Sequence, residues 1–150
     1  MEKRREAAEL TLTTGSTLAG HFFLAGTMQG RMGSERVGDV LNLEDGFFPF
    51  GTDAGTTLIN RAHVLKVILP ATVIEAQLDA GYETAKRRQV TLLLTNGEEV
   101  SGMVSVYLPE GRDRLSDFAR LHDRFRYVEL PDRTVLVNST HIVAMSEVAE

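Results

Sequence analysis

The chain contains no cysteine. This absence excludes a disulfide framework, a thiolate zinc site and a cysteine nucleophile. No apolar run approaches the roughly 20 residues that a helix needs to span a bilayer. The first residues also lack the apolar core of a signal peptide. We therefore expect a cytoplasmic protein that does not contact a membrane.

Familiar catalytic motifs are missing as well. The sequence has no Gly-x-Ser-x-Gly nucleophile elbow, no Gly-x-x-x-x-Gly-Lys phosphate loop and no His-Glu-x-x-His zinc motif. Gly26, Gly30 and Gly33 lack the spacing and the long following helix of a dinucleotide site. A zinc site needs three or four converging ligands, and the sequence offers no recognisable set. We expect no enzyme activity, no metal and no cofactor.

Positive charge is scarce, because the net charge is −5 with 16 basic and 21 acidic side chains. General affinity for nucleic acid depends on lysines and arginines that neutralise phosphates. The compact basic clusters are Lys3-Arg4-Arg5 and Lys86-Arg87-Arg88, one at the start of each half of the chain. RNA binding would therefore need a local patch, since the bulk charge does not favour it.

The main positive feature of the sequence is an internal repeat. Residues 35–67 align without a gap on residues 113–145, a constant shift of 78 residues. Upstream, residues 10–20 match residues 92–102. The identical pairs in the ungapped stretch include Arg36/Arg114, Asp39/Asp117, Asp45/Asp123, Phe47/Phe125, Thr56/Thr134, Leu58/Leu136, Asn60/Asn138 and His63/His141.

A duplicated unit is one structural package whose copies pack or act together. Each copy has about 60 residues and would bury only about 60% of its unfolded surface, so it would be marginally stable alone. We expect three segments: a first repeat over 1–70, a connecting segment over 71–88 and a second repeat over 89–150. The copies should support each other or oligomerise.

Alternating apolar residues predict that each copy opens with a β-hairpin. The turns are Thr13-Thr14-Gly15-Ser16 and Thr95-Asn96-Gly97-Glu98, and Asn-Gly is the strongest short hairpin signal. Gly20 and Gly102 fall at the same point of the second strand, where glycine often marks a bulge or bend. The remaining predicted elements are short helices at 37–41 and 115–121, and strands at 47–50, 57–59, 64–68, 125–130, 134–137 and 142–145.

The segment between the copies predicts a connecting helix over 71–88. Thr72 and Glu75 have the spacing of a capping box, and an apolar face would follow at Ile74, Leu78, Tyr82 and Ala85. Gly81 weakens this helix. A strand extension is the alternative.

The hairpin pattern apolar-x-apolar-x-x-Gly-x-x-apolar-x-Gly resembles the Sm-like small β-barrel family. The tandem arrangement is similar to duplicated bacterial relatives of unknown function. The resemblance implies a mainly β fold, with two tandem Sm-like five-stranded small barrels, short helices and a connecting helix.

In Sm-like rings RNA is commonly held by an Asp-x-apolar-apolar-Asn segment and by the turn between the fourth and fifth strands. Asp39-Val-Leu-Asn42 and the turn from Asn60 to His63 are similar to these positions. The second copy has Arg120 in place of the asparagine, and neither turn has the Arg-Gly dipeptide of many family members. The resemblance implies these RNA-binding or ligand-binding candidates: Asn42, Asn60, Arg61, His63, Asn138 and His141.

The repeated Asn-x-x-His turn has two interpretations. As a ligand site, asparagine offers a donor and an acceptor, while imidazole can stack on a base or meet a phosphate. As a structural feature, asparagine suits the turn and histidine closes it through a backbone hydrogen bond. Turn chemistry alone explains the asparagine.

Other residues are candidates for an interface with a protein partner. Arg36/Asp39 and Arg114/Asp117 have the i, i+3 spacing of a helix ion pair, which either caps the short helix or faces a partner. Phe48 is expected to point away from the core, beside the surface of Leu24. We expect a non-enzymatic adaptor or assembly module that binds protein partners or itself, and the alternative is an RNA-binding Sm-like protein.

Overall fold

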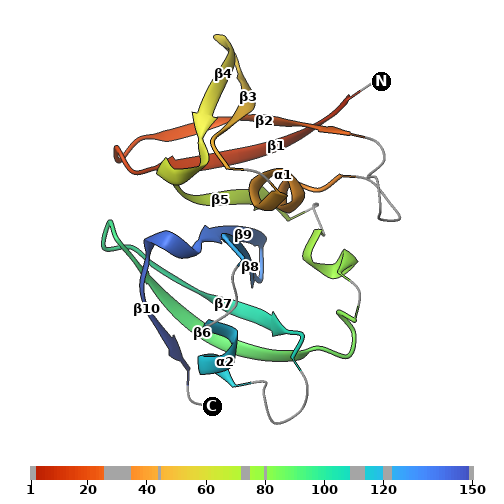
Figure 1. The fold of residues 1–150 in the computed structure, drawn as a ribbon, viewed down its shortest axis with the longest axis vertical. Coiled ribbons are helices and arrows are strands. Elements are labelled where there is room, and N and C mark those ends of the chain that lie inside the picture. Colours follow the sequence, from red (N-terminus) through yellow and green to blue (C-terminus); the bar gives the residue numbers. More distant parts are fainter. Residues whose placement is uncertain are drawn as a thin grey trace.

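The computed structural model describes residues 3–25, 35–43, 45–71, 75–79, 81–108, 114–119 and 123–148. The fold is mainly β, as the sequence predicts. Ten strands form one antiparallel sheet in the order β10-β6-β7-β8-β9-β5-β1-β2-β3-β4. In Figure 1 the first repeat forms the upper half and the second repeat the lower half.

The two repeats have the same order of elements. The first contains β1 (Lys3–Leu12), β2 (Thr17–Ala25), α1 (Val37–Leu43), β3 (Phe47–Thr52), β4 (Gly55–Asn60), the 3-10 turn η1 (Arg61–His63) and β5 (Val64–Pro70). The second contains β6 (Lys86–Leu94), β7 (Glu99–Val106), α2 (Leu115–Ala119), β8 (Phe125–Leu130), β9 (Arg133–Asn138), the 3-10 turn η3 (Ser139–His141) and β10 (Ile142–Glu147).

Both opening hairpins are confirmed. β1 pairs with β2 and β6 with β7 through nearly their whole lengths. Gly15 and Gly97 have φ angles of 90° and 89° in the two turns, a conformation that glycine adopts without steric cost. Gly20 is required for another reason: a Cβ there would lie 2.0 Å from the carbonyl oxygen of Gly51. The close approach of β3 leaves no room for a side chain here, so glycine is required by this contact and not by a bulge.

Each repeat has its own apolar core. The first core includes Phe22, Phe48 and Phe50, and the rings of Phe22 and Phe48 stack with their centroids 5.3 Å apart. The expectation that Phe48 and Leu24 form an exposed interface is wrong, because both side chains are fully buried. Phe48 and Phe50 are two residues apart on β3 and therefore share its inner face. The phenylalanine that faces solvent is Phe47.

The predicted continuous helix over 71–88 is also wrong. The described part of this segment contains one 3-10 turn, η2 (Glu75–Leu78), and residues 86–88 already belong to β6. Gly81 has a φ angle of 81°, which a right-handed helix does not allow. Pairing of Lys86 with Val106 provides β6 with a neighbouring strand instead. Thr72 lies outside the described residues.

Candidate functional site

The seam between the repeats is a pair of strands. β5 of the first repeat runs antiparallel to β9 of the second, from Lys66 opposite Val137 to Pro70 opposite Arg133. This pairing makes one continuous sheet of the two halves (Figure 1). The fifth strand of one repeat thus pairs with the fourth strand of the other.

The apolar cores also cross the seam. Phe125 and Leu136 come from the second repeat, yet both pack in the core of the first. Their exposed fractions are 1% and 0%. The first repeat therefore completes its core with side chains from its neighbour.

Asn138 and His141 hold the seam through polar contacts. The Asn138 amide nitrogen donates to the carbonyl oxygens of Arg61 at 3.3 Å and Val64 at 2.9 Å. The His141 Nε2 atom lies 2.8 Å from the carbonyl oxygen of Ala62. Since a carbonyl can only accept, Nε2 carries the hydrogen, and Nδ1 accepts from the Thr95 hydroxyl at 3.2 Å. These two candidate ligand residues bind the first repeat's turn.

Asn60 and His63 form the same turn without a neighbouring repeat. Asn60 accepts from the Ala62 amide at 3.0 Å, and His63 Nδ1 lies 3.1 Å from the Thr13 hydroxyl. Within the described parts of the chain, the amide nitrogen of Asn60 and Nε2 of His63 have no hydrogen-bond partner. The local turn chemistry is therefore common to both repeats, whereas the contact across the seam is made only once.

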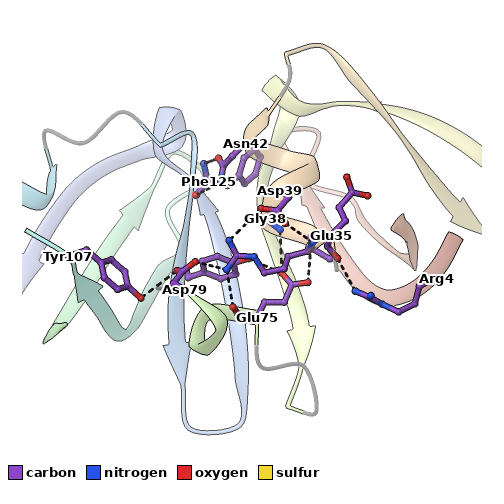
Figure 2. Close-up of polar contacts among 12 residues, drawn as sticks. Arg4, Glu35, Gly38, Asp39, Asn42, Glu75, Asp79, Tyr107 and Phe125 are labelled. Carbon is purple, nitrogen blue, oxygen red and sulfur yellow. Dashed lines mark hydrogen bonds and ion pairs between the residues drawn. The ribbon is translucent and has the colours of Figure 1, made fainter. Parts of the chain in front are cut away.

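The side chains of Asn42 and Arg61 make hydrogen bonds to backbone groups. Asn42 makes two hydrogen bonds with Phe125, donating to its carbonyl at 3.0 Å and accepting from its amide at 2.7 Å (Figure 2). The buried Arg61 guanidinium donates to the carbonyls of Val40, Asp45 and Phe47. The expectation that Arg61 faces a ligand is wrong, because its side chain is only 3% exposed.

Arg36 and Asp39 belong to a network around the connecting segment. Arg36 bonds Asp39 at 3.4 Å and also pairs with Asp79 (Figure 2). The Arg36 amide donates to the Asp39 carboxylate at 2.8 Å. The predicted i, i+3 pair thus exists, and Asp39 also stabilises the start of α1. The side chain of Asp117 lies outside the described residues, so the Arg114/Asp117 pair stays a prediction.

Glu75 is the centre of this network, and sequence reasoning assigned it only to a helix cap. Its carboxylate is 4% exposed. It accepts from the amides of Val37 at 2.7 Å and Gly38 at 3.3 Å and from the Tyr127 hydroxyl at 2.8 Å. Burial raises the pKa of Glu75 above its ordinary value, although these hydrogen bonds lower it. Burial and the Glu75 charge raise the pKa of Tyr127.

The raised pKa of Glu75 predicts how the stability of the protein changes with pH. A carboxyl whose pKa is higher in the folded state favours folding when protonated, so its stabilisation is lost as pH rises through that pKa. The free energy of unfolding of the wild type, minus that of Glu75→Gln, should therefore increase from neutral pH toward 4.5. Urea denaturation at several pH values in this range measures this difference in the free energy of unfolding. Glu83→Gln is the control, because Glu83 is exposed. A difference that stays flat or falls would contradict the assignment.

A cavity of about 270 Å³ lies beside the same network. Its walls include Tyr107, Phe118 and Tyr127. The charged side chains around it are mostly acidic: Asp39, Asp79, Asp123 and Glu129 against Arg36 and Arg126. Phosphate groups are bound by an excess of positive charge, so this cavity does not suit a nucleotide or an RNA backbone.

The basic clusters at the strand starts have partners of their own. Arg4 donates to the carbonyl of Glu35 at 2.9 Å. Arg88 pairs with Glu147 at 2.7 Å, and the Arg87 guanidinium lies 4.3 Å from the centre of the Tyr82 ring. These contacts favour the interpretation of both clusters as solvated strand ends.

β10 and β4, the two end strands of the sheet, each have one backbone edge with no neighbouring strand among the described residues. Among the strands of the described residues, β4 pairs only with β3, and β10 pairs only with β6. Large apolar side chains are exposed on these strands or next to them: Leu58 of β4 at 65%, Val143 of β10 at 61%, Phe47 of the neighbouring β3 at 61%, and Val148, just after β10, at 44%. A backbone edge with exposed apolar side chains is a template for another strand. These edges form the candidate interaction site.

Among the described residues, no group of three or more His, Cys, Asp or Glu side chains could hold a metal ion. Their helices are all too short or too polar to cross a membrane.

Comparison with known proteins gives no match to a family model, a curated protein or a solved structure.

Proposed function

We propose that this protein is a non-enzymatic assembly module that binds polypeptide by strand addition at β4 and β10. The observation that carries this proposal is the pair of open sheet edges with their exposed apolar side chains. In strand addition, backbone hydrogen bonds supply affinity and alternate side chains supply specificity. Both components are available at these edges.

The edges have few of the features that keep proteins monomeric: β10 has one register shift of the bulge type, between Ile142 and Ala144. Natural sheets protect their edges with lysine, proline, bulges or inward-pointing charges. β4 has the sequence Gly-Thr-Thr-Leu-Ile-Asn, without a charged residue or proline. β10 has a single charge, Glu147, which pairs with Arg88. An unprotected edge of this kind is expected to have a partner.

We also propose that each repeat is an Sm-like small barrel. The support is the shared strand order, in which the fifth strand lies beside the first and the fourth lies at the far end. The close approach of β3 at Gly20 and of β8 at Gly102 supports strong curvature in both repeats.

The test is selection of random heptapeptides displayed on phage. The bait carries Ser146→Glu, which blocks β10 with a charge and leaves β4 open. Peptides should be enriched on this bait, lost when Leu58→Glu is added, and retained when Leu78→Glu is added instead. Leu78 is the matched control because it is 59% exposed but lies on η2, away from both edges. Equal enrichment on all three baits would refute binding at β4.

A further inference from the structure

The cavity of about 270 Å³ lies where the two repeats and the connecting segment meet. Asp39 and Asn42 come from α1, Asp79 follows η2, and most of the remaining walls come from the second repeat. Tyr107 is 44% exposed and the Asp79 side chain 28%, so solvent reaches the cavity here. Figure 2 shows the Tyr107 hydroxyl directed toward Asp79. The volume is near the lower end of the range for ligand pockets, so it suits a small molecule.

All three tyrosines of the chain lie at this cavity. Tyr107 and Tyr127 line it. The Tyr82 hydroxyl lies 2.9 Å from both carboxylate oxygens of Glu129, which is another lining residue. Tyrosine combines an apolar ring with a polar hydroxyl and is enriched where proteins bind partners. The composition of the walls is therefore typical of a binding site.

Negative charge exceeds positive charge around the cavity. The described residues that line it include four carboxylates and two guanidinium groups, a net charge of −2. Arg36 pairs with Asp39 and Asp79. Arg126 donates to two backbone carbonyls of α2 and to the Ser139 hydroxyl. Both arginines thus have partners in the protein, and the charge that is left to balance is negative.

The walls already bind guanidinium groups of the chain itself. The guanidinium carbon of Arg36 lies 5.8 Å from the centre of the Tyr127 ring, and that of Arg126 lies 4.7 Å from the centre of the Phe118 ring. Aromatic rings attract cations through their negative faces and are used to recognise ammonium ligands. Rings and surplus carboxylates together favour an organic cation.

The repeated fold does not require these side chains. The equivalents of Tyr127 and Glu129 in the first repeat are Pro49 and Gly51. All four residues belong to the third strand of their repeat. The same strand therefore forms without a tyrosine and a glutamate at these positions, and the chemistry of the cavity is a property of the second repeat.

We propose that this cavity binds a small organic dication that carries a guanidinium or ammonium group at each end, such as an aminoguanidine or a diamine. The charge of +2 balances the surplus of −2 on the walls. This inference is independent of strand addition at β4 and β10. Because the walls come from both repeats and from the connecting segment, the bound dication would stabilise the junction between them.

Calorimetric titration of the wild type with agmatine, an aminoguanidine of charge +2 at neutral pH, tests the proposal. Agmatine should bind at one site per chain and raise the melting temperature. 4-Guanidinobutyrate is the matched control ligand, because a carboxylate replaces the amine and the net charge falls to zero; it should not bind. The chain has no tryptophan, so tyrosine emission comes from this cavity and should change as agmatine saturates it.

Two variants locate the binding site. Glu129→Gln keeps an oxygen that can accept from Tyr82 but removes one charge. It should weaken agmatine binding about fivefold, which corresponds to two unit charges about 4 Å apart in water. Glu83→Gln is the matched control, because Glu83 is exposed and does not line the cavity. Tyr107→Ala removes a half-exposed wall and should also weaken binding, which keeps the test open if Glu129→Gln does not fold.

Four results would overturn the proposal. Absence of heat and of a melting shift at millimolar agmatine would refute binding. Equal affinity for agmatine and 4-guanidinobutyrate would show that the charge of the walls does not select the ligand. Equal effects of Glu129→Gln and Glu83→Gln would mean that agmatine binds the acidic surface in general. Tighter binding of N-acetylarginine amide than of agmatine would assign the cavity to an arginine side chain of a partner polypeptide.

Discussion

Phe125→Ala should lower the free energy of unfolding by about 3–5 kcal/mol, the usual range for a buried phenylalanine. The ring is 1% exposed and fills the core of the first repeat from β8 of the second. Its removal leaves a cavity at the seam, so both halves should be destabilised in one cooperative transition. Urea denaturation followed by circular dichroism measures the change.

Phe47→Ala is the matched control, since the two phenylalanines are equivalent in the repeats. Phe47 is 61% exposed in the single chain, and exposed substitutions usually change stability by less than about 0.5 kcal/mol. The comparison is made with Ser146→Glu added to both variants, so that assembly does not bury Phe47. Equal losses for the two variants would contradict the position of Phe125 at the seam.

Asn138→Ala should cost about 2–4 kcal/mol. The side chain is fully buried, donates to the carbonyls of Arg61 and Val64, and accepts from the amide of Thr140. Truncation leaves buried groups without partners, and each such group costs about 1–3 kcal/mol.

Asn60→Ala is the control for the local turn. Among the described residues, the Asn60 side chain makes only the equivalent bond to the amide of Ala62, and loss of a capping asparagine costs about 1 kcal/mol. Chemical denaturation of both variants separates the turn contribution, which they share, from the seam contribution, which only Asn138 makes. Losses of equal size would mean that the contacts across the seam contribute little.

Local sequence patterns predicted much of the secondary structure correctly. The two hairpins follow from alternation of apolar residues and from Gly15 and Gly97 in their turns. These are short-range effects, because side-chain alternation and positive φ angles are properties of a few adjacent residues. Prediction failed where contacts between residues far apart in the sequence determine the secondary structure. The segment before β6 has a helical pattern, but Lys86 and its neighbours pair with β7 instead.

The candidate site was predicted only in part. Repetition of the Asn-x-x-His turn drew attention to four side chains, but it did not indicate what they contact. Asn138 and His141 bind the first repeat, whereas the side chains of Asn60 and His63 bond to Ala62 and Thr13 of their own repeat. The sequence signal that could have pointed to this seam was the duplication itself. Glu75 carried no comparable signal, because its partners Val37 and Tyr127 lie far away in the sequence.

The sequence by itself determined a mainly β chain built from two equivalent units, because alternation, turn chemistry and repetition act over short distances. The tertiary structure alone decided that β5 pairs with β9 and that β4 and β10 remain at the ends of the sheet. Because of this strand pairing, Phe125 is buried whereas its equivalent Phe47 is exposed. The physical reason is that burial depends on which strand lies alongside, and strand partners are chosen by the packing of the whole chain.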